Sequence, residues 1–401
     1  MELRDIEALV QPSDDQILLL VLDGLGGLPR EPGGTTELEA ARTPNLDHLV
    51  RSGSCGLHEP VAPGVTPGSG PGHLALFGYD PLRYRIGRGV LEALGIGFDL
   101  EERDVAVRGN FCTLDADGVV RDRRAGRIPT AEAEPLARVL DEVEVEDAEV
   151  HVRSVKEHRF LLVLRFPEPV GADVTDTDPG RPGEAPAEPE ARSEDAARAA
   201  RAVGAWLDGA RERLAGRETA NMVLLRGFSS LPDWPRFPDV WGMRSLAAAA
   251  YPMYRGVARL VGMDAVPVEE GPDALVEALE GDAGAYDFVF LHYKPTDRAG
   301  EDGDFGRKVS FIEEMDAAVP RLLDAGPDVV LVTGDHSTPA VMRRHSWHPV
   351  PFLLTGGPGR TGSRERFGET ECARGIHGRR RAPELMPLAA ARAGRLAKYG
   401  A

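Results

Sequence analysis

The chain is poor in cysteine and in lysine, and its charge is strongly negative. Its three cysteines, Cys55, Cys112 and Cys372, are odd in number and scattered among 401 residues, which argues against a disulfide framework and against a cysteine-bound metal centre. The formal net charge of -18 makes nucleic acid and anionic membranes poor partners. A site for an anionic ligand would therefore need local cations, from metal ions or from clustered arginines.

The N-terminal region lacks both a membrane span and a signal pattern. Its apolar run, residues 17–22, is far too short to cross a bilayer, and the acidic residues Glu2 and Asp5 precede it. With 42% hydrophobic and 28% charged residues, the composition is that of a globular protein large enough for more than one core. We expect a cytoplasmic protein without a membrane segment.

Acidic residues follow three apolar runs of strand length. Asp23 comes directly after residues 17–22, Asp297 follows residues 288–292, and Asp335 with His336 follows residues 329–333. Runs that are apolar at every position are typical of central parallel strands with helices on both faces. Open α/β sheets bind their ligands at the carboxyl ends of such strands. We therefore expect these acidic residues at the ligand-binding edge of a parallel sheet.

The segments around these runs predict helices and one further strand. Residues 308–323 have the pattern of an amphipathic helix between two of the runs, which gives a β-α-β unit. Thr43 and Pro44 open another helix as its cap and first-turn residue. A short strand is expected at residues 350–354 and a C-terminal helix at residues 382–398.

The middle of the chain has a different pattern. It predicts short alternating strands at 105–111, 149–155 and 160–166, helices at 130–143 and 195–214, and a mobile loop at 168–194. The simplest organisation is an α/β fold in which a mostly parallel sheet, sandwiched by helices, is built from residues 1–89 and 236–401. A smaller α+β domain, residues 90–235, is then inserted into it.

A serine lies in a segment rich in glycine and proline. Residues 67–72 read Pro-Gly-Ser-Gly-Pro-Gly, and a helix-like run follows them. Gly68 and Gly70 would allow a sharp turn, and Pro71 suits the first position of a helix. Ser69 would then lie at or near the N-cap, where free N–H groups favour an anion. It is either an ordinary cap or a nucleophile that carries a phosphoryl group.

The acidic residues, the histidines and Ser69 together have the chemistry of a metal site. Carboxylate oxygens with a few imidazoles suit Mn²⁺, Zn²⁺ or Mg²⁺, and the set is too large for one ion. Two ions that share a phosphate could activate Ser69 and stabilise the phosphoryl oxygens. The set consists of Asp23, Ser69, Asp297, Glu301, Asp335, His336 and His345.

Several members of this set have alternatives. Asp297 and Glu301 are spaced to share one face of a helix, but Gly300 and Gly303 suggest a tight loop. His345 competes with His348 as a ligand. Asp23 could simply cap a turn. The ordered set carries more weight than any one of its members.

The ordered set resembles the alkaline phosphatase superfamily and, more narrowly, the archaeal-type branch of cofactor-independent phosphoglycerate mutases, which also occurs in bacteria. The resemblance runs nearly from end to end. It is carried by residues 22–26, 43–47, 67–81, 87–95, 108–111, 122–128, 221–227, 256–264, 296–304, 334–339 and 349–351.

The resemblance implies an isomerase, an intramolecular phosphotransferase that interconverts 3-phosphoglycerate and 2-phosphoglycerate without 2,3-bisphosphoglycerate. It implies that Ser69 is phosphorylated, that Asp23, Ser69, Asp335 and His336 hold one metal ion, and that Asp297 and His345 hold the other. We expect two divalent ions, Mn²⁺ first, with Mg²⁺, Co²⁺ or Zn²⁺ as alternatives. The glycerate must stay trapped while it turns over, so two domains must close over it.

Arginines of the inserted domain are the expected ligands of the substrate's carboxylate and phosphate, since guanidinium groups bind such oxygens in pairs. Arg108, Arg123 and Arg127 lie in segments similar to the family's, and Lys156 and Arg255 are further candidates. Surface salt bridges are the alternative role for each. An oligomer is compatible with the sequence but is not predicted by it.

The chain departs from the family pattern at three positions. Glu301 stands where the pattern usually has histidine, Gly70 follows the nucleophile where aspartate is usual, and Gly27 replaces another common aspartate. Glutamate can still bind a hard divalent ion, with a preference shifted away from Zn²⁺. Two further hypotheses therefore stay open: a phosphohydrolase or a phosphomutase for another small metabolite, and a non-catalytic protein that binds metal or phosphorylated metabolites.

Overall fold

The three apolar runs lie next to one another in one sheet. β1 (Ile17–Leu22) pairs in parallel with β10 (Phe288–Tyr293) on one side and with β11 (Val329–Thr333) on the other. Every residue of the three strands is buried. Helices cover both faces of the sheet, which explains why these strands are apolar at every position. As parallel strands, they bring their carboxyl ends to the same edge.

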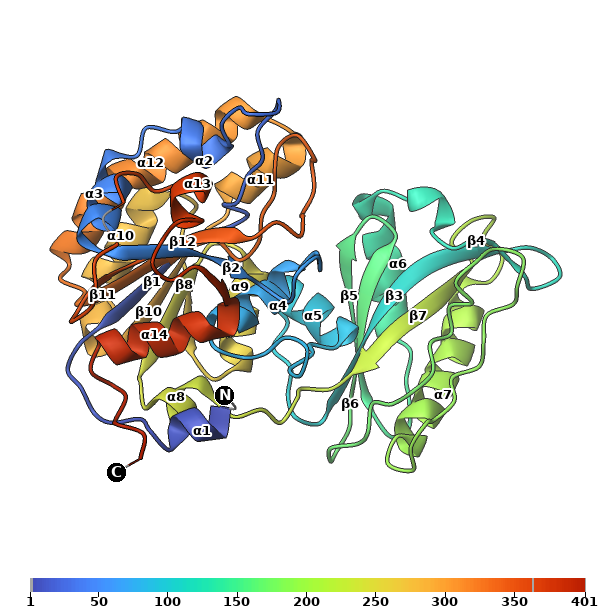
Figure 1. Cartoon of the computed structure of the whole chain (residues 1–401). Coiled ribbons are helices and arrows are strands. Elements are labelled where there is room, and N and C mark those ends of the chain that lie inside the picture. The colour runs from blue at the N-terminus through green and yellow to red at the C-terminus, as the bar shows by residue number, and fades with distance from the viewer. Residues whose placement is uncertain (1–2, 363, 401) are drawn as a thin grey trace. The chain divides into compact units, whose positions relative to one another are not determined.

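The computed structural model describes residues 3–362 and 364–400, and these form two compact units (Figure 1). The first consists of the described residues of Met1–Arg85 and Trp234–Ala401, and the second is Ile86–Asp233. The expected boundaries, 89/90 and 235/236, differ from these by a few residues. The helix that starts at Arg88 packs on strands of the second unit. Trp234 and Pro235 contact Tyr79 of the first unit.

Within the described residues, the sheet of the first unit has eight strands in the order β13-β2-β12-β11-β1-β10-β8-β9. β12 runs antiparallel to both of its neighbours, and the other pairs are parallel. The other strands are β2 (Ser54–Glu59), β8 (Ser245–Ala249), β9 (Asp264–Pro267), β12 (Val350–Gly356) and β13 (Arg379–Arg381).

Helices lie on both faces of this sheet (Figure 1). α3, α10 and α12 share one apolar core with the strands, and α4, α8, α9 and α14 lie on the opposite face. The helices are α1 (Leu3–Glu7), α2 (Glu37–Ala40), α3 (Pro44–Ser52), α4 (Ser69–Leu76), α8 (Phe237–Trp241), α9 (Pro252–Leu260), α10 (Pro272–Glu280), α11 (Pro295–Asp302), α12 (Phe305–Asp324), α13 (Glu369–Cys372) and α14 (Leu385–Arg392), with single turns η2 (Asp282–Ala285) and η3 (Ala382–Glu384).

The second unit is an antiparallel sheet with helices on both faces. β3 pairs with β4, β6 and β7, and β6 pairs with β5. α6 and α7 share a core with one face, and α5 packs on the other. The elements are β3 (Asp104–Leu114), β4 (Val120–Asp122), β5 (Glu149–Lys156), β6 (Arg159–Arg165), β7 (Met222–Ser229), α5 (Arg88–Gly95), α6 (Thr130–Asp141), α7 (Ala197–Leu214) and η1 (Ala125–Arg127).

The predicted α/β fold class is confirmed, and four predicted helices have different bounds. Of the helices expected at 130–143 and 195–214, α6 ends at Asp141 and α7 starts at Ala197. α12 starts three residues earlier than expected, because the Asp304 side chain caps it by accepting from the Arg307 amide. The C-terminal helix is shorter than residues 382–398: α14 ends at Arg392, and Gly394 then has a left-handed φ of 64°. Among the described residues, none of the helices has both the length and the apolar character that crossing a membrane requires.

Candidate active site

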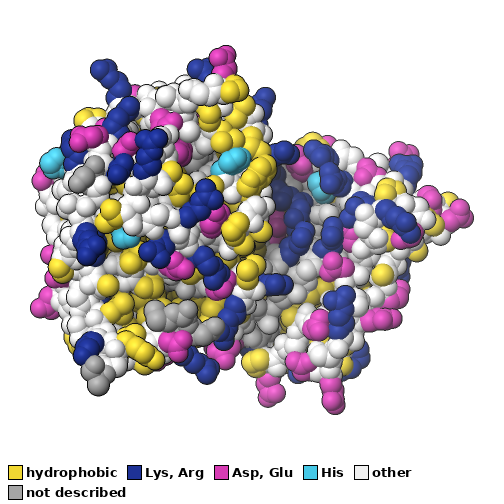
Figure 2. Space-filling view, viewed as in Figure 1, with side chains coloured by type: hydrophobic (Ala, Val, Ile, Leu, Met, Phe, Trp, Pro, Cys, Tyr) yellow, Lys and Arg dark blue, Asp and Glu magenta, His cyan; other side chains and the backbone are white. Residues whose placement is uncertain are grey.

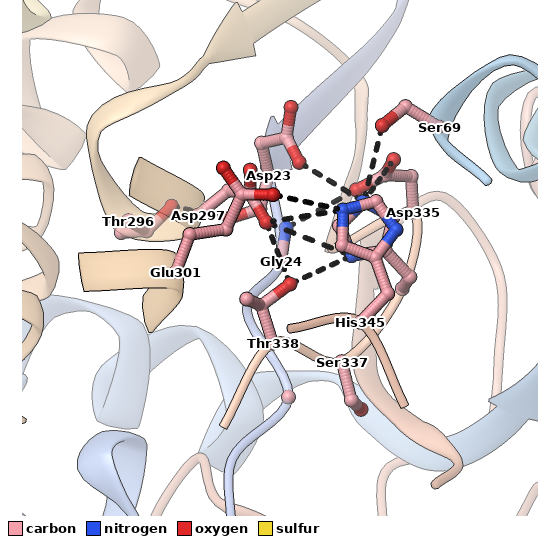
Figure 3. A network of polar contacts seen from close by, with 12 residues as sticks. Asp23, Gly24, Ser69, Thr296, Asp297, Glu301, Asp335, Ser337, Thr338 and His345 are labelled. Atoms are coloured by element: carbon pink, nitrogen blue, oxygen red, sulfur yellow. Dashed lines mark hydrogen bonds and ion pairs between the residues drawn. The ribbon is translucent and has the colours of Figure 1, made fainter. Parts of the chain in front are cut away.

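Two buried carboxylates lie at the carboxyl ends of adjacent strands. Asp23 follows β1 and Asp335 follows β11, and both are fully buried. Asp335 Oδ1 accepts from the Gly24 amide at 3.1 Å, which ties the two strand ends together. A hydroxyl and an imidazole join them. Ser69 lies on the same side of the site as Asp335 (Figure 3), and its Oγ is 3.3 Å from His336 Nε2. The structure thus brings together the four residues predicted for one metal ion.

Ser69 is the first residue of α4, and Gly68 is the N-cap. The serine is half-buried, so a ligand can reach it. Pro71 occupies the third helical position, so its expected place at the first position was wrong. Gly68 and Gly70 have no positive φ, so the turn does not need glycine there for its conformation. Gly72 is the glycine that packing requires, since a Cβ there would lie 2.6 Å from the Asp335 carbonyl oxygen.

The hydrogen bonds around His336 identify its free nitrogen. Thr338 Oγ1 donates its proton to Asp297 Oδ1 at 2.6 Å, so it accepts from His336 Nδ1 at 2.9 Å. Burial lowers the pKa of His336, which favours the neutral ring. Nε2 is then the unprotonated nitrogen, and it points at Asp23 Oδ1, 3.4 Å away, and Asp335 Oδ2, 3.1 Å away.

These three atoms fit a cation. Asp23 Oδ1 and Asp335 Oδ2 are buried and have no hydrogen-bond partner in the described residues. Two carboxylate oxygens and an imidazole lone pair converge on one point, and this concentration of acceptors favours a cation there. Asp23, Asp335 and His336 form one of two groups of metal-ligand type among the described residues. Oxygen and imidazole donors suit a hard or borderline divalent ion.

The second group is Asp297, His336 and His345. His345 Nδ1 donates to the Pro67 carbonyl at 3.0 Å, so its Nε2 is free to bind. This nitrogen lies 3.7 Å from Asp297 Oδ1. The rings of His336 and His345 stack with centroids 3.6 Å apart. His336 offers Nε2 to the first group and bonds Thr338 through Nδ1, so Asp297 and His345 are the residues that belong to the second group alone.

Glu301 lies at the rim of the second group. Asp297 and Glu301 share one face of α11, so the alternative of a tight loop was wrong; Gly303 ends the helix with a φ of 78°. Glu301 Oε1 is 3.8 Å from His345 Nε2, and the side chain is half-exposed. Burial, and then the negative charge of Asp297, raise the pKa of Glu301. His348 contacts Ser346 and Trp347 and belongs to neither group.

Lys294, which sequence reasoning did not single out, joins the two groups. Its Nζ donates to Asp23 Oδ2 at 3.2 Å, to Asp297 Oδ2 at 2.6 Å and to Tyr254 Oη at 2.9 Å. Burial alone would lower the pKa of Lys294, but the two carboxylates raise it overall. Its position directly after β10 and three residues before Asp297 was the feature of the sequence that could have indicated a role in the site.

Two further histidines, also missed from the sequence, lie beside the carboxylates. His292 Nε2 donates to Asp23 Oδ2 at 3.0 Å, and a partner of this kind fixes the direction in which a ligand's second oxygen points. His73 Nδ1 donates to the Ser69 carbonyl at 2.8 Å and lies 3.3 Å from Asp335 Oδ2. Both side chains are buried.

The second unit holds a cavity of about 390 Å³ lined by arginines. Figure 2 shows Lys and Arg side chains gathered on the visible face of this unit. Of the predicted residues, Arg108, Arg123 and Arg127 line the cavity. Burial, and the nearby Arg159, Arg88 and Arg226, lower the pKa of Arg108. The other lining residues are Arg88, Asn110, Arg124, Glu157, His158, Arg159 and Arg226.

Three of the predicted substrate-binding residues either lie outside the cavity or are already paired with other groups. Lys156 is exposed on β5 and does not line the cavity. Arg255 belongs to the first unit, and its Nη1 donates to the carbonyls of Ala249 and Ala250 at 2.7 Å each. Arg123 lines the cavity but forms a bidentate pair with buried Asp178, at 2.8 and 2.7 Å. Asp178 lies in the 168–194 stretch, which forms no helix or strand.

Comparison with known proteins identifies the family. A family model described as 2,3-bisphosphoglycerate-independent phosphoglycerate mutase matches residues 51–220. A relative from Thermus thermophilus, described as "Probable 2,3-bisphosphoglycerate-independent phosphoglycerate mutase", is 52% identical over 401 residues, covering 99% of this chain and 98% of the relative. This chain belongs to the 2,3-bisphosphoglycerate-independent phosphoglycerate mutase family. The predicted resemblance is confirmed, and with it the predicted enzyme class, an isomerase.

Solved structures agree with this family membership. A protein from Pyrococcus horikoshii has a TM-score of 0.78 at 32% identity, covering 96% of this chain and 99% of its own. The cofactor-independent phosphoglycerate mutase from Thermoplasma acidophilum has a TM-score of 0.76 at 30% identity, covering 94% and 100%. Both matches span the two units described above.

The structure explains one departure from the mutase family pattern. A Cβ at Gly27 would lie 1.9 Å from Glu37 Oε2, so the Glu37 carboxylate fills the space that a side chain at position 27 would need. Glu37 is fully buried and accepts from the amides of Leu28 and Ala340. Nothing in the structure explains glycine at position 70.

Proposed function

We propose that this chain interconverts 3-phosphoglycerate and 2-phosphoglycerate through a phosphoserine at Ser69. The observation that carries the proposal is the approach of Ser69 Oγ to His336 Nε2, at 3.3 Å, beside two buried carboxylate oxygens without hydrogen-bond partners. A half-buried hydroxyl beside a cation-binding group can take a phosphoryl group and return it. Ser69 is therefore proposed as the nucleophile and not as a simple cap.

The site residues of the first unit each have a defined role in this proposal. Asp23, Ser69, Asp335 and His336 would hold one divalent ion, and Asp297 and His345, with Glu301 at the rim, the other. Two such ions lower the pKa of a serine hydroxyl and offset the charge of phosphoryl oxygens. Lys294 adds a fixed positive charge between Asp23 and Asp297. Mn²⁺ as the physiological ion and the cytoplasm as the location stay predictions.

The second unit would bind the anionic groups of the substrate. Of the described residues that line its cavity, several carry guanidinium groups and one, Glu157, is acidic. Arginine forks match carboxylate and phosphate oxygens, so this cavity suits a small molecule with both groups. The chain as a whole is acidic, and this cluster supplies the local positive charge that an anionic ligand needs.

The proposal is tested by starting the reaction from each of the two phosphoglycerates and measuring the final ratio between them. The Mn²⁺-loaded protein is incubated with 3-phosphoglycerate or with 2-phosphoglycerate, quenched, freed of metal and analysed by NMR. The same ratio of the two phosphoglycerates from either start supports a mutase. Glycerate and free phosphate from both starts would establish a phosphohydrolase, the second function that a serine at a metal site allows.

Removing the carboxylate of Glu301 should weaken the second metal ion. In Glu301→Ala, we expect the affinity of the more weakly held Mn²⁺ to fall at least about tenfold, because the group loses its third charged or imidazole donor. Glu301→His should shift the preference from Mn²⁺ toward Zn²⁺. Calorimetric titration of metal-free protein measures both effects. Asp302→Asn, an exposed neighbour on α11, is the control; wild-type affinity in Glu301→Ala would remove Glu301 from the site.

Removing the guanidinium of Arg108 should weaken substrate binding. In Arg108→Met, we expect the KM for 3-phosphoglycerate to rise at least about tenfold, because a charge-assisted contact to the substrate is lost. Steady-state kinetics at saturating Mn²⁺ measure the change. Lys156→Met removes a cation of the same unit that lies outside the cavity, and its KM should stay at the wild-type value. An equal rise in both variants would point to general attraction of anions instead.

A further inference from the structure

One lysine lies fully buried beneath the metal-ligand groups. Lys308, on α12, has no exposed surface. Its Nζ donates to three backbone carbonyls: Gly24 at 2.8 Å, Gly26 at 3.0 Å and Thr338 at 2.8 Å. Carbonyl oxygens only accept, so three bonds of this kind require all three protons of an ammonium group. Lys308 is therefore a charged group whose donors are all used by the backbone.

The three carbonyls belong to the two loops that carry the ligands. Gly24 directly follows Asp23, and Thr338 lies two residues after His336. The loops also contact each other, because the Thr338 amide donates to the Gly24 and Gly26 carbonyls at 3.2 and 3.0 Å. The side chain of Thr338 in turn bonds Asp297 and His336 (Figure 3). Lys308 thus holds the point at which these ligand-bearing segments meet.

Two carboxyl groups accept hydrogen bonds from backbone amides of the same loops. Glu37, on α2, accepts from the Ala340 amide at 2.7 Å and from the Leu28 amide at 3.2 Å. Glu369 accepts from the Gly27 amide at 2.9 Å. Burial lowers the pKa of Lys308, and Glu37 and Glu369 act in the opposite direction, toward the charged form. The loops are therefore held from both sides, by the Lys308 ammonium at their carbonyls and by carboxyl groups at their amides.

We propose that Lys308 is a positioning residue that sets the two ligand-bearing loops in their metal-binding geometry before any ion arrives. Among the described residues, the hydrogen bonds of Lys308 Nζ go to backbone carbonyls and not to metal-ligand side chains, so Lys308 acts through the backbone of Gly24, Gly26 and Thr338. A buried ammonium is costly to desolvate, and its hydrogen bonds to the three carbonyls offset part of that cost. The inference rests on the proposed metal site, but not on the identity of the substrate.

Metal affinity separates this role from ordinary stabilisation. Lys308→Met keeps the length of the side chain and removes the charge and the three donors. We expect its Mn²⁺ affinity, measured by calorimetry well below the unfolding temperature, to fall at least about tenfold, with Lys156→Met at the wild-type value. A lower unfolding temperature with unchanged Mn²⁺ affinity would overturn the proposal, because a merely structural lysine would give that result.

Chemical rescue gives a second, independent test. Lys308→Ala removes three methylenes and the ammonium, which is the composition of propylammonium. Added propylammonium should restore at least part of the Mn²⁺ affinity of this variant. Tetramethylammonium, which has the same charge and no N–H donor, should restore none. Equal effects of the two cations would overturn a role that depends on donation to the carbonyls.

Hydrogen exchange of the wild-type protein covers the case in which the variants do not fold. If Lys308 and not the metal sets the loops, the Thr338 amide should stay protected after all metal is removed. Rapid exchange of this amide in folded, metal-free protein, and protection only after Mn²⁺ is added, would overturn the proposal. Because neither affinity nor exchange depends on turnover, failure of the mutase assay and failure of this inference are separate results.

Discussion

Ser69→Ala should abolish turnover while the protein keeps its fold and its substrate binding. Removing Oγ removes the atom that would receive the phosphoryl group, so we expect kcat to fall by at least about three orders of magnitude. The variant loses a single atom at the start of α4, where Gly68 and not Ser69 is the N-cap, so helix stability should change little. A coupled assay measures kcat, and mass spectrometry of acid-quenched protein detects phosphoserine in the peptide that contains residue 69.

A matched control separates the nucleophile from its surroundings. Thr66→Ala removes an exposed hydroxyl from the loop that leads to α4, and it should keep wild-type turnover and phosphorylation. Residual turnover of Ser69→Ala within tenfold of wild type would contradict a serine nucleophile. So would phosphorylation of a peptide that does not contain Ser69.

Asp335→Asn should lose one metal ion and almost all activity. Asparagine keeps Oδ1, which accepts from the Gly24 amide, and replaces Oδ2, which has no hydrogen-bond partner, with an NH₂ group. This change puts protons where the account places a cation and removes the negative charge. We expect kcat to fall by at least about three orders of magnitude. Metal analysis of the purified variant should find one ion fewer than in wild type.

The same substitution at the other end of β11 provides the control. Asp328 immediately precedes β11, and its Oδ2 accepts from the Gln16 amide at 2.8 Å. Asp328→Asn should keep both the metal content and the activity of wild type, since this carboxylate bonds only backbone near the opposite end of the strand. If Asp335→Asn keeps its full metal content, the assignment of Asp335 as a ligand is wrong.

The strands and the residues that follow them could be predicted because burial on both faces leaves a continuous apolar signal. Residues 17–22 and 329–333 matched β1 and β11 at both ends, and the acidic residue after each lies in the site. Parallel pairing then brings the ends together without further information. The order of the motifs identified the family, which the similarity to known mutases confirms.

The rest of the site could not be predicted because it depends on contacts across the fold. Lys294 and Lys308 have different roles in the structure. In the sequence, however, Lys294 is only a lysine that follows a predicted strand, and Lys308 is only a lysine in a predicted helix. Their partners, Asp23 for one and Thr338 for the other, are set by tertiary packing. Arg255 was predicted to bind substrate, but its guanidinium donates to the nearby Ala249 carbonyl. This local hydrogen bond could not be read from the sequence.

The local sequence around Ser69 is compatible with a cap as well as with a nucleophile, and the ordered set and the family resemblance favoured the nucleophile. The structure adds the approach of Ser69 Oγ to His336 Nε2, at 3.3 Å, which supports that prediction. The glycine that packing requires in α4 was also not predicted, because Gly72 lies against the Asp335 backbone, a contact across the fold. Close backbone approach of this kind leaves no signal in local sequence.

The central claim is that the phosphoryl group returns to the glycerate and does not pass to water. The direct test supplies Mn²⁺-loaded protein with 3-phosphoglycerate, without 2,3-bisphosphoglycerate, and couples it to enolase while free phosphate is measured in the same sample. The account predicts phosphoenolpyruvate with no matching release of phosphate. Phosphate release without phosphoenolpyruvate would contradict it.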